Sequence, residues 1–244
     1  MNKSNKGFTL VELLVVIGIL GILMGALFPA ISSAMLSANA SSMSMRGRKL
    51  FEGITQCNIE REGKGLPSMW PVSADQQSDD GEDIAGMPFS DATTYFKEVF
   101  DIDNYGTAEW DPYVRSCDIS VLSGSGVPSM SGSDLQQQNV AWIVCKGVTS
   151  EMEDIIPVLV SRNLSTDQFA KQSTTETSSK TTQLPTDTQF PLPFGNKASV
   201  IIHKGGAASV FKGRYQSLSD IYDRQTVTFT EGSKGIDYIS PSAN

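Results

Sequence analysis

The chain has 244 residues, of which 39% are hydrophobic, and its 19 Lys and Arg against 27 Asp and Glu give a formal net charge of −8. This negative balance argues against general binding to nucleic-acid phosphates. One histidine and three cysteines, with no C-x-x-C spacing, lack the patterns needed for a metal cluster or for Ser/His or Cys/His catalysis, so we expect no enzymatic activity.

Residues 8–31 form one apolar run with a single charge, Glu12, and a short basic head containing Lys3 and Lys6 precedes it. The run is long enough to cross a hydrocarbon core of about 30 Å. The two lysines place the N-terminus in the cytoplasm and the rest of the chain on the far side of the membrane. Because a carboxylate inside such a helix is costly, Glu12 is a candidate functional residue that needs a charged partner.

The stretch GFTLVE at residues 7–12, followed by the apolar run, resembles the N-terminus of type IV pilins and type II secretion pseudopilins. This resemblance implies that a prepilin peptidase cuts between Gly7 and Phe8 and methylates the new Phe8 amine. It also implies that Glu12 meets the Phe8 amine of a neighbouring subunit in a filament. A buried carboxylate recovers much of its desolvation cost only beside such a partner, so Glu12 would set the stagger between subunits.

Small residues and a proline interrupt the apolar run. Gly21 and Gly25 form a G-x-x-x-G pattern, which lets membrane helices approach closely. Pro29 has no N–H to donate to the Gly25 carbonyl, so we expect a kink there, and the resemblance implies that this stretch bends or unwinds in a filament. The candidate assembly residues are Phe8, Thr9, Glu12, Gly21, Gly25 and Pro29.

A secretory signal peptide is the alternative interpretation of this N-terminus. It also combines a basic head and an apolar stretch with a small-residue cleavage site, such as Ala-Asn-Ala at residues 38–40. Its apolar region spans only about 7–15 residues, however, and a glutamate at the start disfavours it. The first residue of the mature protein distinguishes the two interpretations. Prepilin processing produces a chain that starts at Phe8, whereas signal-peptide cleavage produces one that starts at Ser41.

Helical spacing continues beyond the apolar run and ends at the GKGLP stretch, residues 63–67. Apolar or small residues recur at intervals of four and three, at Leu36, Ala40, Met43, Gly47, Leu50, Ile54 and Cys57. We therefore expect one helix over residues 8–62, with residues 8–31 as transmembrane segment and later filament core. Residues 32–62 would be the spine of a globular domain at 63–244, and residues 1–7 the leader peptide.

The sequence of the globular domain predicts short strands separated by Gly, Pro and Ser, and one short helix at residues 91–100. The strands are expected at residues 140–145, at 155–160 with an edge-type proline, at 199–204 and 207–211 as a hairpin around Gly205-Gly206, and at 227–229. The pattern and the resemblance together indicate the α+β architecture of pilins, a long N-terminal helix packed on an antiparallel β-sheet. Residues 71–86 and 165–189 lack apolar periodicity, so we expect them to be mobile loops.

The sequence contains one loop that resembles a calcium site and three cysteines. Residues 101–106 begin like a calcium loop, but Tyr105 takes a ligand position and Pro112 stands where the bidentate glutamate belongs. No metal ligands are therefore assigned, although major pseudopilins often bind calcium in loops of the sheet, which the resemblance leaves open here. A periplasmic domain permits one disulfide, and Cys117–Cys145 is the candidate pair, with three buried thiols as the alternative.

One dense basic stretch, formed by Arg46, Arg48, Lys49 and Arg61, lies on the expected spine. It either is a solvated face or meets acidic loops, such as residues 71–86, of a neighbouring copy.

The resemblance implies a structural, non-enzymatic subunit, namely a pseudopilin of the type II secretion pseudopilus that supports protein export. It would sit in the bacterial inner membrane with its C-terminal domain in the periplasm before it polymerises through its N-terminal helix. Its partners would be prepilin peptidase, copies of itself, other pilins or pseudopilins, the assembly platform and the bilayer. Two alternatives stay open: a type IV pilus or competence subunit, and a membrane-tethered binding module that never polymerises.

Overall fold

The computed structural model describes residues 8–66, 68–71, 89–148, 152–165, 191–213 and 238–241. The chain divides into two compact units, Met1–Ala38 and Asn39–Asn244, which are described separately below. The leader at 1–7, the strand expected at 227–229, and the loops expected at 71–86 and 165–189 (except residues 71 and 165) lie outside the described residues.

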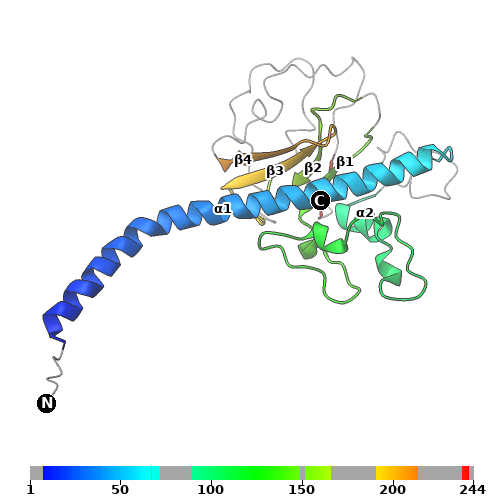
Figure 1. Ribbon diagram of the computed structural model, residues 1–244. Coiled ribbons are helices and arrows are strands. Elements are labelled where there is room, and N and C mark those ends of the chain that lie inside the picture. The colour runs from blue at the N-terminus through cyan, green and yellow to red at the C-terminus, as the bar shows by residue number, and fades with distance from the viewer. Residues whose placement is uncertain are drawn as a thin grey trace, which may run out of the picture. The chain divides into compact units, whose positions relative to one another are not determined.

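Helix α1 spans Leu10–Glu62, close to the range expected from the sequence (Figure 1). The helix ends just before the GKGLP stretch, as the sequence predicted. Gly65 in this stretch adopts a φ of +72°, a conformation that favours glycine. The N–H of Leu66 then donates to the carbonyl of Arg61 at 2.9 Å, which closes the last turn. By length and composition, the first part of α1 could cross a membrane, and none of that stretch is buried.

In the second unit, one face of α1 is buried along the predicted seam. The buried residues of the helix are Ala40, Met43, Gly47, Leu50, Gly53, Ile54, Cys57 and Arg61. The prediction is confirmed from Ala40 to Cys57, whereas Leu36 is only half-buried. Period and burial agree because residues three and four apart share one helix face.

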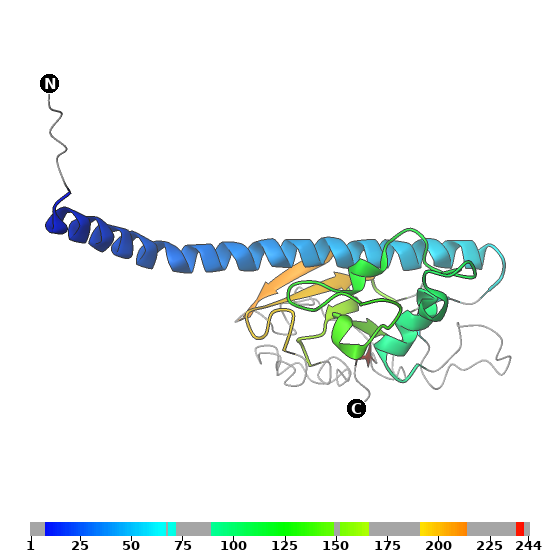
Figure 2. The same ribbon diagram turned by 90° about the horizontal axis from the view of Figure 1, so that it is seen from below.

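The helix face packs against a five-stranded antiparallel sheet. The strands are β1 (Trp142–Cys145), β2 (Pro157–Ser161), β3 (Ala198–His203), β4 (Ala208–Lys212) and β5 (Tyr238–Ile239), in the order β4-β3-β2-β1-β5. Every residue of β1, β2 and β3 is buried. Figure 2 shows the part of α1 that belongs to the second unit running along one side of this layer. The fold is therefore the pilin-like α+β arrangement that the sequence predicted.

The proline of β2 was wrongly predicted to mark an edge strand. β2 lies inside the sheet between β1 and β3. Pro157 is tolerated there because it is the first residue of the strand, beside a register shift between Pro157 and Leu159. The hairpin prediction is confirmed, since β3 and β4 pair around a turn in which Gly206 has a φ of +80°.

The predicted short helix is α2, Ala92–Val99. Its N-cap is Asp91, whose carboxylate accepts a hydrogen bond from the Thr94 N–H at 2.9 Å. Tyr95 and Phe96 are fully buried, so the helix contributes aromatic volume to the core.

Candidate functional site

The N-terminal end of α1 is closed by a reciprocal pair of side chains. The Thr9 N–H donates to Glu12 Oε2 at 2.8 Å, and the Thr9 hydroxyl donates to the same oxygen at 2.7 Å. In return, the Glu12 N–H donates to Thr9 Oγ1 at 3.3 Å. This is a capping box, in which two otherwise unpaired backbone donors at the helix start find partners.

The box explains why α1 begins at Leu10, two residues after the start expected from the sequence. It also orients the carboxylate of Glu12, because Oε2 carries both bonds from Thr9. Within the described chain, Oε1 of Glu12 accepts no hydrogen bond, so it is open to a donor from outside. The negative charge lies at the positive end of the helix dipole, which stabilises it.

This local role of Glu12 was not predicted from the sequence. The signal was present, because Thr9-x-x-Glu12 before an apolar run is the sequence pattern of a capping box.

The first unit exposes its large apolar side chains. Phe8 is 76% exposed, Leu10 80% and Phe28 73%, and other Leu, Ile and Val side chains of the stretch are also exposed. An added Cβ at Gly21 or Gly25 would meet no atom within 4 Å. An apolar surface of this length, with no described element of the chain over it, needs a lipid or protein partner.

A family model for the prokaryotic N-terminal methylation motif matches residues 2–28, a range that contains the capping box and most of the apolar stretch. This motif marks the N-terminus of type IV pilins and pseudopilins. The motif implies processing by prepilin peptidase and pilin-type assembly, and it indicates a structural, non-enzymatic role with membrane anchoring before assembly. No curated protein and no solved structure matches the chain.

The loop that begins like a calcium-binding loop, at residues 101–106, is held by hydrogen bonds to nearby residues of the same chain. The carboxylate of Asp101 accepts from the side-chain amide of Asn104 at 2.9 Å and from the N–H of Asp111 at 2.8 Å. The indole of Trp110 donates to the Phe100 carbonyl at 2.9 Å. Within the described ranges, no group of three or more His, Cys, Asp or Glu is placed to hold a metal ion.

All three cysteines lie among the described residues, and all are thiols. The candidate Cys117–Cys145 disulfide is therefore not formed in this structure. Cys145 is buried in β1, where its thiol donates to the Lys146 carbonyl at 3.4 Å. Cys117 lies instead against α1, where a Cβ added to Gly53 would be 3.3 Å from its sulfur. Burial raises the pKa of the Cys117 thiol to about 11, with a smaller contribution from Asp118.

Two of the four basic residues on the spine are engaged within their own chain. Arg46 Nη1 donates to the Ser123 carbonyl at 3.2 Å and also to the Ser120 carbonyl. Arg61 is only 7% exposed, and its guanidinium lies 5.9 Å from the centre of the Tyr113 ring. Only Arg48 and Lys49 of this stretch are exposed.

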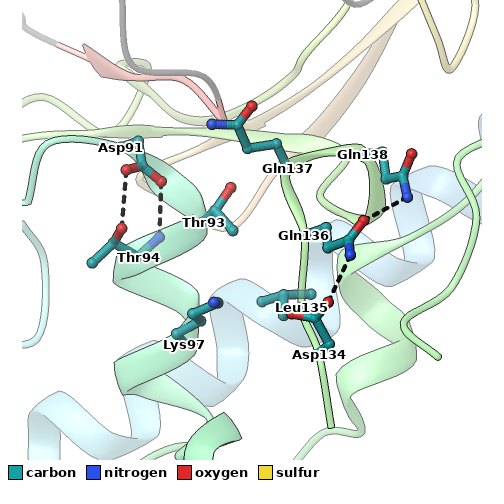
Figure 3. Close-up of a pocket in the computed structure, with 9 residues that line it drawn as sticks. All are labelled: Asp91, Thr93, Thr94, Lys97, Asp134, Leu135, Gln136, Gln137 and Gln138. Carbon is teal, nitrogen blue, oxygen red and sulfur yellow. Dashed lines mark hydrogen bonds between the residues drawn. The ribbon is translucent and has the colours of Figure 1, made fainter. Parts of the chain in front are cut away.

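A polar groove of about 600 Å³ lies between α2 and residues 134–138 (Figure 3). Its side chains largely bond to one another. Gln138 donates to Gln136 at 2.7 Å, and Gln136 donates to Asp134 at 2.6 Å. The lining contains no aromatic ring and no cluster of nucleophiles, so we assign no chemistry to it.

His203, the single histidine of the sequence, is a structural residue at the end of β3. The Nδ1–H donates to the Ile155 carbonyl at 2.5 Å, and Nε2 accepts from the Ser209 hydroxyl at 3.1 Å. Burial lowers the pKa of His203 below its ordinary value of 6.5, and the bond to Ile155 opposes this effect in part. The ring is therefore neutral in the folded protein near neutral pH.

We expect the free energy of unfolding to fall as the pH drops below 6.5, the ordinary pKa of histidine. The unfolded chain then binds a proton that the folded chain does not, so acid favours unfolding. Thermal unfolding of the full chain between about pH 7.5 and pH 5 measures this slope, with His203→Gln as the comparison. The variant should show a flatter dependence, and equal slopes for both proteins would contradict the assignment.

Proposed function

We propose that this protein is a pseudopilin of a type II secretion pseudopilus, which prepilin peptidase processes and which polymerises to support protein export. The observation that carries the proposal is the N-terminal motif on an apolar helix that no described element of the chain covers. Residues 1–7 would be removed, residues 8–31 would form the membrane anchor and then the filament core, and residues 32–62 would support the periplasmic domain at 63–244.

In this proposal, Glu12 pairs with the amine of Phe8 on a neighbouring copy. The capping box supports this role, because Thr9 holds one carboxylate oxygen and leaves the other open. A carboxylate held in one orientation can discriminate a correctly staggered neighbour from a displaced one. The positive partner offsets the cost of placing the charge among apolar helices.

Other residues of the anchor are proposed to act in packing. Gly21 and Gly25 leave room for a neighbouring helix, since an added Cβ at either would meet nothing in the chain itself. Pro29 lies inside α1 and lacks an N–H, so it is the proposed place of bending on entry into the filament. The remaining partners would be the inner-membrane assembly platform and other pseudopilins.

The mature N-terminus provides the first test. Mass spectrometry of the protein purified from its native cells should find a chain that starts at Phe8 and carries a methyl group on its amine. A chain that starts at Met1 or at Ser41 would contradict prepilin processing.

Substitution of Glu12 provides the second test. Glu12→Ala should leave membrane insertion intact but prevent incorporation into filaments, because both the charge and the cap are lost. Glu12→Gln separates the two effects, since glutamine at this position also completes a capping box but has no charge. We expect Glu12→Gln to fail in assembly as Glu12→Ala does. Normal incorporation of Glu12→Gln would show that the charge is not needed.

A type IV pilus or competence subunit would share every feature of this N-terminus. Long filaments sheared from the cell surface, rather than short periplasmic ones, would assign the protein to a pilus. A chain that stays monomeric in cells that build the filament would instead be a membrane-tethered binding module.

A further inference from the structure

The loop that follows α2 holds one tryptophan ring at the surface. Trp110 is 41% exposed, whereas the other two tryptophans of the sequence are buried. The exposed ring is fixed in place, because its N–H donates to the Phe100 carbonyl at 2.9 Å and the ring of Tyr105 makes a T-shaped contact with it at 5.3 Å. A ligand that covers a ring already held in one position costs the protein little further side-chain entropy.

The same loop carries an excess of carboxylates. Residues 101–115 contain four acids and one base. Asp103 and Glu109 are exposed, and within the described chain their carboxylates make no hydrogen bond and no ion pair. Glu109 directly precedes Trp110, and Asp103 lies two residues before the tyrosine that contacts the ring. We call Asp103, Glu109 and Trp110 the Trp110 site. The carboxylates and the negative face of the indole both attract cations.

Two guanidinium groups of the chain itself already bind to this loop. Arg115 forms an ion pair with Asp111, and the guanidinium of Arg61 lies 5.9 Å from the centre of the Tyr113 ring. The first uses a carboxylate and the second uses an aromatic ring. The Trp110 site offers both kinds of group together, and in the part of the chain that the structure describes no Lys or Arg lies over its ring.

We propose that the Trp110 site binds an arginine side chain in a basic segment of another protein. Arginine suits the site better than lysine, because a planar guanidinium stacks on an indole while its N–H groups donate to carboxylates. The charge of the loop disfavours anionic partners. A neutral sugar also stacks on exposed aromatic rings, but it gains nothing from the unpaired carboxylates. The proposal goes beyond the filament function and does not depend on it.

Peptide binding to the full chain in a nonionic detergent tests the proposal. The probe is an amidated Gly-Arg-Gly-Arg-Gly peptide, and matched peptides carry lysine or glutamine in place of arginine. We expect the arginine peptide to bind about threefold tighter than the lysine peptide, and the glutamine peptide not to bind. A rise in salt from about 50 to about 300 mM should weaken binding, because exposed charges are then screened. Tryptophan emission should change on binding, since Trp110 is the exposed tryptophan.

Two variants and a control locate the binding, with fluorescence anisotropy of a labelled arginine peptide as the readout. Trp110→Leu should weaken binding about fivefold through loss of the ring. The double variant Asp103→Asn/Glu109→Gln should also weaken it about fivefold, and it leaves the ring and its bond to Phe100 in place. Glu52→Gln/Glu153→Gln makes the same charge change at exposed acids elsewhere, so it should bind like the wild type.

Equal binding of the three peptides, equal losses in the control and the double variant, or unchanged tryptophan emission would overturn the proposal. Emission that responds to a neutral oligosaccharide, but not to the arginine peptide, would assign a carbohydrate site instead. Emission that depends on protein concentration, and no longer does so in Arg48→Gln, would assign the site to a second copy of the chain. The peptide assay needs only the folded chain, so a failure of filament assembly leaves its result unchanged.

Discussion

Arg162→Met is expected to lower the free energy of unfolding by about 3 kcal/mol or more. Arg162 is only 3% exposed. Its Nη1 donates to the carbonyls of Gln137 at 2.9 Å, Gln138 at 3.2 Å and Val140 at 2.8 Å, and its Nε donates to the carbonyl of Leu192 at 3.1 Å. Methionine fills similar space but donates nothing, so these carbonyls lose a charged donor in a buried setting.

Denaturant unfolding of the full chain measures this loss, and Arg115→Met is the matched control. Arg115 makes an ion pair with Asp111, but both side chains are more than two-thirds exposed, at 71% and 73%. An exposed pair contributes at most about 1 kcal/mol, so the control should change little. Equal losses in the two variants would show that the buried guanidinium has no special role in joining the segments around 137–140 and 192.

The second large effect is expected at Gly47, where α1 lies close against side chains of the sheet. An added Cβ would lie 2.6 Å from Cη2 of Trp142, and 2.7 Å and 2.8 Å from two carbon atoms of Ile202. Both side chains are fully buried, and the indole N–H of Trp142 is fixed by a 2.9 Å bond to the Val121 carbonyl. The neighbours therefore cannot move away, and the helix must shift outward.

Overpacking of this kind costs about 1–3 kcal/mol, whereas alanine in a helix interior regains about 1 kcal/mol over glycine. We expect Gly47→Ala to lower the free energy of unfolding overall, and Gly47→Leu to lower it much more. Gly21→Ala is the control on the same helix, because its added Cβ would meet nothing within 4 Å. Thermal unfolding of the full-length proteins in detergent, followed by tryptophan fluorescence, compares them. Stability of Gly47→Ala at or above wild type would contradict the close approach.

Local sequence patterns predicted the elements that depend on local physics. The seam from Ala40 to Cys57 follows from helix periodicity, and the β3–β4 hairpin follows from two strand-forming runs around adjacent glycines. The Asp91 cap places α2 within one residue of its predicted range. The capping box of Thr9 and Glu12 could also have been predicted from the sequence, because all its hydrogen bonds join residues three positions apart.

Predictions failed where the outcome depended on residues far apart in the chain. Pro157 suggested an edge strand, but β2 pairs with β1 on one side and β3 on the other. β5 has only two residues and pairs with β1, which precedes it by more than ninety positions. No local sequence pattern therefore predicts this strand. The role of Arg162 likewise depends on carbonyls 22 to 30 residues away.

The N-terminal segment of this protein was determined by its sequence alone. Its length, apolar character and single glutamate are local properties, and so is the N-terminal methylation motif that a family model matches at residues 2–28. Tertiary structure alone decided the order of the strands, the buried bonds of Arg162 and the choice of Arg48 and Lys49 as the exposed part of the basic stretch. The physical reason is that hydrogen-bond partners and burial are set by segments that meet only after the chain has folded.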